Sequence, residues 1–229
     1  MQNKIYFIFI LCCYCSCFLH AQINECPKEL GSYTGTCIKY FEDKNFEIRE
    51  YKNGLLDGKL EGFTKDSILS EEKYFKNGKI YGRSTYYYED GITPAGYTDF
   101  GENGDSTKYV RFYENGNLKE EYFYNDDTAV GDWKNFYENG VLESVCTYKN
   151  GYIEGWCMQY YESGSIKSKT FYVHGSIEGK TYGYYENGQL GVVADHVNSA
   201  RHGVVIWYEK NGEIMDRTYY LNGKVKRDR

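Results

Sequence analysis

The stretch YKNGYIEGWCMQYYESG (residues 148–164) contains two turn signals separated by a run of strand-forming residues. Asn150-Gly151 is a strong β-hairpin signal, because both residues accept the positive φ that a two-residue hairpin turn requires. The second signal, YESG, ends at Gly164. The residues between the turns are rich in Tyr, Trp and Ile, which favour strands. This stretch therefore predicts one β-hairpin and the turn that follows it.

The same two turns recur along the chain with a period of 24 residues. The first-series turns, most of them YENG, end at Gly116, Gly140, Gly164, Gly188 and Gly212. The second-series turns lie 11 residues further on, at Asp127, Gly151, Gly175, Ser199 and Gly223. With slips of one or two residues, the earlier members are Lys44, Ser67 and Gly91 in the first series and Gly31, Gly54, Gly78 and Gly104 in the second.

A further glycine follows most second-series turns at a distance of four residues. These repeat glycines are Gly35, Gly58, Gly82, Gly131, Gly155, Gly179 and Gly203, whereas Lys108 stands at this position after Gly104.

The alternating turns predict an all-β fold, an elongated antiparallel meander of tandem 24-residue β-hairpin repeats in a single-layer twisted sheet. A composition of 27 Tyr, 25 Gly and only 2 Pro fits long uninterrupted strands with tight turns. We expect each hairpin to contact mainly its neighbours. The paired aromatics Tyr160-Tyr161 and Tyr184-Tyr185 are expected to form ladders on opposite faces instead of a thick core.

The hairpin YKNGYIEGWCMQYYESG and the surrounding YENG hairpins resemble MORN-type repeats, in the repeat variant common in bacteria. Residues 198–203 (NSARHG) are also close to the middle of that motif, and the resemblance extends from Cys26 to Arg229. It implies a β-hairpin array that serves as an assembly or binding scaffold. Membrane-lipid binding has been proposed for some arrays of this type, and many bacterial variants are labelled as antitoxins.

The N-terminus has the features of a secretory signal peptide. Lys4 precedes an apolar run from Ile5 to Leu19, which is short for a membrane-spanning helix. We expect cleavage after Ala21, so that residues 1–21 are the signal peptide and residues 22–229 the repeat array. A lipoprotein signal using Cys17, or a retained anchor, is the alternative.

Four cysteines, Cys26, Cys37, Cys146 and Cys157, follow the signal peptide, and an even number in an exported chain predicts disulfides. The equal spacing suggests the local bridges Cys26–Cys37 and Cys146–Cys157. A strict two-residue turn would place Cys146 opposite Gly155. If the two cysteines face each other instead, the loop holds four residues and Tyr148 opposes Gly155. This second register, which we expect, also pairs Tyr51 with Gly58, Phe75 with Gly82, Tyr124 with Gly131 and Tyr172 with Gly179.

Neither charge nor motifs indicate catalysis. Without Lys4, 26 Lys and Arg stand against 33 Asp and Glu, a charge of −7 with no basic stripe for nucleic acid. His174, His196 and His202 occupy repeat positions, and Asn125-Asp126-Asp127 is best explained as a degenerate turn instead of a calcium loop. We find no nucleophile, phosphate or zinc motif and expect no catalytic residue, cofactor or metal.

Residues 92–107 (ITPAGYTDFGENGDST) interrupt the period and contain Pro94. They are interpreted as an insertion in a surface loop, or alternatively as a binding loop or a bend.

The sequence therefore predicts an exported, non-enzymatic scaffold that binds a protein or another component of the cell envelope. The alternatives are an antitoxin-like protein that neutralises a toxin in the cytoplasm, and an array that binds membrane lipid. The acidic charge disfavours lipid.

Overall fold

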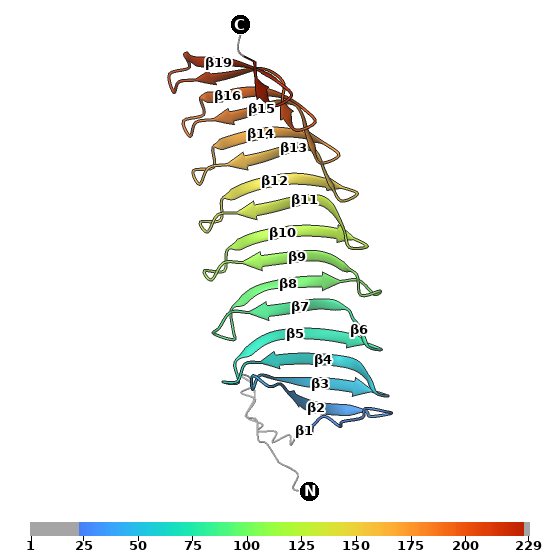
Figure 1. Ribbon diagram of the computed structural model, residues 1–229. Helices are drawn as coiled ribbons and strands as arrows, with labels where there is room; N and C mark the ends of the chain where they lie inside the picture. The colour runs from blue at the N-terminus through green and yellow to red at the C-terminus, as the bar shows by residue number, and fades with distance from the viewer. Residues whose placement is uncertain (1–22, 227–229) are drawn as a thin grey trace. The chain divides into compact units, whose positions relative to one another are not determined.

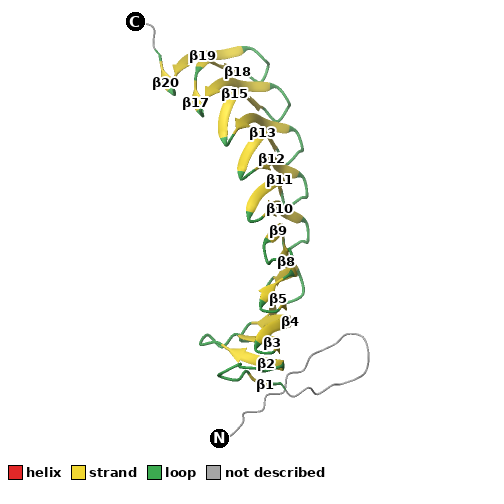
Figure 2. Ribbon diagram, turned by 90° about the vertical axis from the view of Figure 1, so that its right-hand side faces the viewer, coloured by secondary structure: helices red, strands yellow, loops and turns green. Residues whose placement is uncertain are grey.

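The computed structural model describes residues 23–226, and every regular element in that range is a β-strand (Figures 1 and 2). This confirms the predicted all-β meander of hairpins. The chain divides into two compact units, residues 1–104 and 105–229. The expected signal peptide and Cys17 lie outside the described residues.

In the first unit, eight strands follow one another in chain order. Their bounds are β1 Asn24–Glu25, β2 Gly35–Tyr40, β3 Phe46–Lys52, β4 Leu55–Phe63, β5 Leu69–Lys76, β6 Lys79–Ile80, β7 Gly82–Tyr87 and β8 Pro94–Phe100. β5 pairs with both short pieces β6 and β7. All pairs are antiparallel except β1 with β2, which is parallel, so the sheet is mixed.

The second unit is an antiparallel meander whose strands can be followed in order in Figure 1. Their bounds are β9 Ser106–Phe112, β10 Leu118–Asn125, β11 Thr128–Phe136, β12 Leu142–Lys149, β13 Tyr152–Tyr160, β14 Ile166–Val173, β15 Ser176–Tyr184, β16 Leu190–Val197, β17 Ala200–Arg201, β18 Gly203–Tyr208, β19 Ile214–Leu221 and β20 Lys224–Val225.

The two turn series have different backbone geometry. At second-series turns such as Asn150-Gly151, both residues have positive φ, 51° and 81°, as in a type I′ hairpin. At first-series turns only the last residue does: Gly164 has φ 84°, and its N–H donates to Tyr161 O at 2.8 Å. This is a three-residue hairpin loop that ends in a left-handed glycine.

Gly104 keeps the place in the alternation of turns that the sequence assigned to it, but its turn does not have second-series geometry. Its N–H donates to Gly101 O at 3.0 Å and it follows a residue with ordinary φ, so it has first-series geometry. The sequence already indicated this difference, because Lys108 stands four residues after Gly104, where other second-series turns are followed by a glycine.

Both registers considered for the cysteine hairpin turn out to hold, each in a different part of it. Near the turn the loop has two residues, and Tyr148 opposes Ile153, not Gly155 as expected. Further from the turn, Cys146 opposes Cys157 as predicted. The register shifts between these pairs, and Gly155, with φ 85°, lies within the additional residues of β13. The repeat glycine is thus the site of a β-bulge.

The predicted pairing of an aromatic with the repeat glycine of its own hairpin was wrong in every hairpin named. An aromatic residue of the next hairpin lies opposite the glycine instead. The observed pairs are Gly35 with Tyr51, Gly58 with Phe75, Gly82 with Phe100, Gly131 with Tyr148, Gly155 with Tyr172 and Gly203 with Tyr220. Tyr124, expected opposite Gly131, instead opposes Ala129.

The N-terminal cysteine segment is not the hairpin that its spacing suggested. β1 runs parallel to β2, with Asn24 opposite Cys37, and Cys26 lies just beyond β1 with its N–H donating to Ile38 O at 2.8 Å. The Gly31 turn nevertheless keeps one repeat contact, since the Gly54 N–H donates to Tyr33 O at 2.8 Å.

Adjacent repeats are also joined by tyrosine hydroxyls. Tyr161 stands in the turn after β13 and not in a ladder on the sheet face, which corrects the expectation for the Tyr160-Tyr161 pair. Its hydroxyl donates to Tyr184 O, 23 residues on, at 2.7 Å. Equivalent bonds run from Tyr113 to Phe136 O, Tyr137 to Tyr160 O and Tyr185 to Tyr208 O.

The irregular segment 92–107 is largely strand. Pro94 is the first residue of β8, a position where its missing N–H is tolerated. The extra residues lie in the turn before β8, where the side chain of Ile92 is 80% exposed.

Candidate functional site

The histidines occupy the repeat positions expected from the sequence and do not converge. His174 lies in a turn with its Nδ1 3.7 Å from Glu154, and the Nδ1 of His202 lies 3.2 Å from Asn222 Oδ1. His196 opposes Gly179 in the aromatic position of the repeat. Within residues 23–226, no group of three or more His, Cys, Asp or Glu is arranged to hold a metal ion.

Asp126 and Asp127 form a second-series turn, with φ values of 45° and 55°. The carboxylate of Asp127 accepts a hydrogen bond from the Ser106 hydroxyl at 2.9 Å. The acidic pair therefore has a structural position in the repeat, as the sequence indicated.

The four cysteines lie in two pairs at disulfide distance, Cys26 with Cys37 and Cys146 with Cys157. Cysteine pairs at this distance are compatible with a protein outside the reducing cytoplasm.

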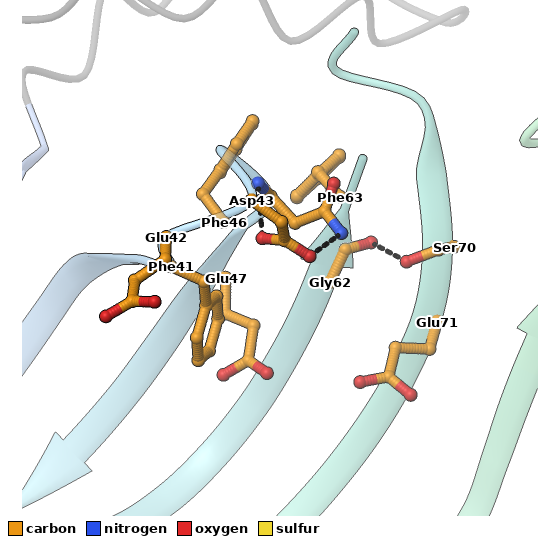
Figure 3. A pocket seen from close by; sticks show the side chains of 10 residues that line it. Phe41, Glu42, Asp43, Phe46, Glu47, Gly62, Phe63, Ser70 and Glu71 are labelled. Atoms are coloured by element: carbon orange, nitrogen blue, oxygen red, sulfur yellow. Dashed lines mark hydrogen bonds between the residues drawn. The ribbon is translucent and has the colours of Figure 1, made fainter. Parts of the chain in front are cut away.

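A hollow of about 510 Å³ lies in the first unit beside the turn between β2 and β3 (Figure 3). Its walls combine three aromatic rings, from Phe41, Phe46 and Phe63, with four carboxylates, from Glu42, Asp43, Glu47 and Glu71.

Most of these carboxylates already have partners. Glu47 accepts from Arg49 at 2.5 Å, Glu71 lies 2.8 Å from Lys73, and Asp43 accepts from the Asn45 side chain. The backbone of Gly62 also lines the hollow, and its carbonyl accepts from the Ser70 hydroxyl (Figure 3). Most of the polar groups that line the hollow therefore already form hydrogen bonds or ion pairs within the sheet.

A second candidate is an apolar surface on one face of the second unit. Trp156 is 47% exposed, and its ring packs against Phe171 at 5.2 Å and Tyr182 at 6.3 Å between centroids. These contacts place residues of β13, β14 and β15 on the same side of the sheet. We call this surface the apolar face; it consists of Trp156, Met158, Phe171, Tyr182, Val193, Val204, Ile206 and Tyr219.

Strand register makes this surface continuous. Tyr182 opposes Val193, Val193 opposes Ile206, and Val204 opposes Tyr219. Directly opposed side chains have Cβ atoms about 4.5–5.5 Å apart, so they form one surface across four strands. Val204 and Tyr219 are 43% and 44% exposed, which leaves apolar area without cover.

Charged side chains lie among the residues of the apolar face. Lys180 Nζ lies 3.0 Å from both carboxylate oxygens of Asp195, and this hydrogen bond raises the pKa of the lysine. Lys169 lies between Met158 and Tyr182, and Arg217 opposes Ile206. The face therefore has three cations and one anion, in contrast to the formal charge of −6 of the whole chain.

The geometry described so far defines a class of protein, an array of β-hairpin repeats in which each repeat is hydrogen-bonded to the next. Comparison with known families identifies the repeat: the model of the MORN repeat variant matches residues 107–126, 129–150, 154–174 and 201–222. The chain is a MORN-type repeat protein, and the matched segments lie in its second unit. No curated protein matches the chain.

The apolar face was not predicted, although the sequence contained a sign of it. Trp156 and Val204 each follow a second-series turn by five residues, and four other repeats have a charged residue there, Lys59, Arg83, Asp132 and Lys180. A tryptophan and a valine at a position that is charged in these repeats indicate a local departure from the solvated pattern. Comparing repeats position by position would have located this surface.

No helix in the described part of the chain is long and apolar enough to cross a membrane.

Proposed function

We propose that this protein is an exported, non-enzymatic scaffold that binds a protein at the cell envelope through the apolar face of its second unit. The observation that carries the proposal is the aromatic cluster of Trp156, Phe171 and Tyr182, in which Trp156 is 47% exposed and the other two rings are partly exposed. Large exposed apolar surfaces on soluble proteins generally mark interaction sites, and tryptophan and tyrosine are enriched at the centres of interfaces.

The family supports a scaffold function, since MORN repeats occur in scaffolds for protein or membrane interaction. Export is supported by the apolar N-terminal run and by the cysteine pairs at disulfide distance. A cytoplasmic antitoxin would instead have an uncleaved N-terminus and four free thiols.

The proposal is tested in the native cell by replacing Trp156 with a photo-crosslinking amino acid. We expect a specific crosslinked adduct in the envelope fraction, identified by mass spectrometry. We also expect the intact mass of the protein to match a chain that begins at Gln22. The matched control carries the crosslinker at Ile92, which is 80% exposed in the first unit. Absence of any adduct specific to position 156, or recovery of the intact chain from the cytoplasm with four alkylatable thiols, would reject the proposal.

A further inference from the structure

One row of directly opposed side chains crosses the apolar face from strand to strand. Lys169 opposes Tyr182, Tyr182 opposes Val193, Val193 opposes Ile206, and Ile206 opposes Arg217. The row thus has a cation at each end and three apolar side chains between them.

Neither terminal cation has a carboxylate partner among residues 23–226. Within residues 23–226, Lys180 pairs with Asp195, and Lys108 pairs with Glu121, but no carboxylate forms an ion pair with Lys169 or Arg217. Lys169 is half-buried between Met158 and Tyr182, whereas Arg217 is exposed, so the cost of desolvation concerns Lys169 alone. A partly desolvated cation without a partner is unfavourable, and a carboxylate supplied by another molecule would remove that cost.

The spacing of these cations restricts the ligand. Four strand-to-strand steps of about 4.8 Å separate Lys169 from Arg217, which gives about 19 Å. An extended peptide rises about 3.3 Å per residue, so it covers this distance in about six residues. Because six is even, the two residues at its ends and the alternate residues between them point to the same side.

We propose that the row from Lys169 to Arg217 binds an extended acidic segment of a partner protein, with two carboxylates six residues apart and apolar side chains at the alternate positions between them. This proposal rests on the proposed function and specifies the chemistry of the partner. Fixed cations that flank an apolar row favour a protein segment over a lipid surface, since lipid headgroups rearrange freely and require no particular cation spacing.

The test measures binding of a fluorescent nonapeptide, Gly-Glu-Thr-Leu-Ser-Leu-Thr-Glu-Gly, to the mature protein. We expect saturable binding that weakens with added salt and falls at least tenfold in Lys169→Glu/Arg217→Glu. The control Lys52→Glu/Lys76→Glu makes the same charge change at exposed residues of the first unit and is expected to bind like the native protein. The neutral pair Lys169→Gln/Arg217→Gln is measured as well, and circular dichroism verifies that each variant is folded.

Three outcomes would overturn the proposal: equal loss in the control pair, equal binding of a peptide with lysine in place of glutamate, or binding to vesicles containing phosphatidylglycerol without binding to the peptide. Failure here is distinct from failure of the proposed function. A Trp156 adduct together with no peptide binding would reject the partner chemistry alone, whereas loss of the adduct would reject the scaffold itself.

Discussion

Tyr148 of β12 lies opposite Gly131 of β11, the bulge glycine of the preceding hairpin, and not opposite Gly155 of its own hairpin. Gly155 is opposed in the same way by Tyr172 of the following hairpin. Each of these aromatic residues therefore lies opposite the glycine of the preceding hairpin, so each glycine obtains its aromatic partner from the next repeat. This arrangement couples repeats along the chain, as in other quasi-one-dimensional proteins.

Replacing Gly155 with alanine is expected to lower the stability of the second unit. Its φ of 85° is in the left-handed region, where a Cβ costs about 1–2 kcal/mol. No heavy atom lies within 4 Å of the Cβ position, so backbone strain and not crowding determines the effect. Gly155→Asn should cost less, because asparagine tolerates this conformation. Urea unfolding followed by circular dichroism measures both variants, and equal midpoints for the two would contradict this account.

The hydroxyl of Tyr137 joins its repeat to the next by donating to Tyr160 O at 2.7 Å. Tyr137→Phe removes this bond and leaves the carbonyl without that donor, at an expected cost of about 0.5–1.5 kcal/mol. Tyr160→Phe is the matched control, since its hydroxyl makes no such bond to the following repeat, and its urea midpoint should stay near the native one. If both variants unfold at the same denaturant concentration, the inter-repeat bond contributes nothing measurable.

The sequence was sufficient to predict the strands and turns because Asn-Gly pairs and glycines act locally. Gly151 defines its own turn whatever lies beside it. The register was harder, since two local rules competed in one hairpin: the turn at Gly151 required a two-residue loop, whereas Cys146 required Cys157 opposite. A bulge at Gly155 satisfies both, and only the three-dimensional pairing shows it.

The candidate site depended on non-local information. Lys169, Tyr182 and Arg217 are far apart in the sequence and meet only through four strand pairings. A repeat sequence also makes such a site hard to recognise, because each residue can be explained by its position in the repeat. Whether Lys169 has a counter-ion cannot be determined from its own repeat, since its neighbours come from the strands on either side.

The cysteine pairs predict a protein without free thiols after export. Alkylation of the unreduced mature protein should modify none of its cysteines, and reduction should expose four. Cys146→Ser/Cys157→Ser is expected to lower the urea midpoint by the equivalent of about 2–3 kcal/mol, because closing a short loop restricts the unfolded chain. A mature protein that reacts with four equivalents of alkylating agent before reduction would refute both bridges.

His196 predicts a dependence of stability on pH. Burial, with a smaller contribution from the positive charge of Arg201 on the opposing residue, lowers the pKa of His196 below its ordinary value of 6.5. The unfolded chain therefore binds a proton more readily than the folded protein. The stability that this residue contributes is fully present above about pH 6.5 and is lost as the pH falls from there through the folded pKa.

The matched variant is His196→Phe, because phenylalanine stands at the equivalent position of another repeat, Phe75 opposite Gly58. We expect the native protein to lose more stability than the variant between pH 7.5 and pH 5, as measured by urea midpoints in the same buffers. His174, His202 and the carboxylates are common to both proteins, so their contributions cancel in the difference. An identical loss in the two proteins would show that His196 does not titrate in the folded state as inferred here.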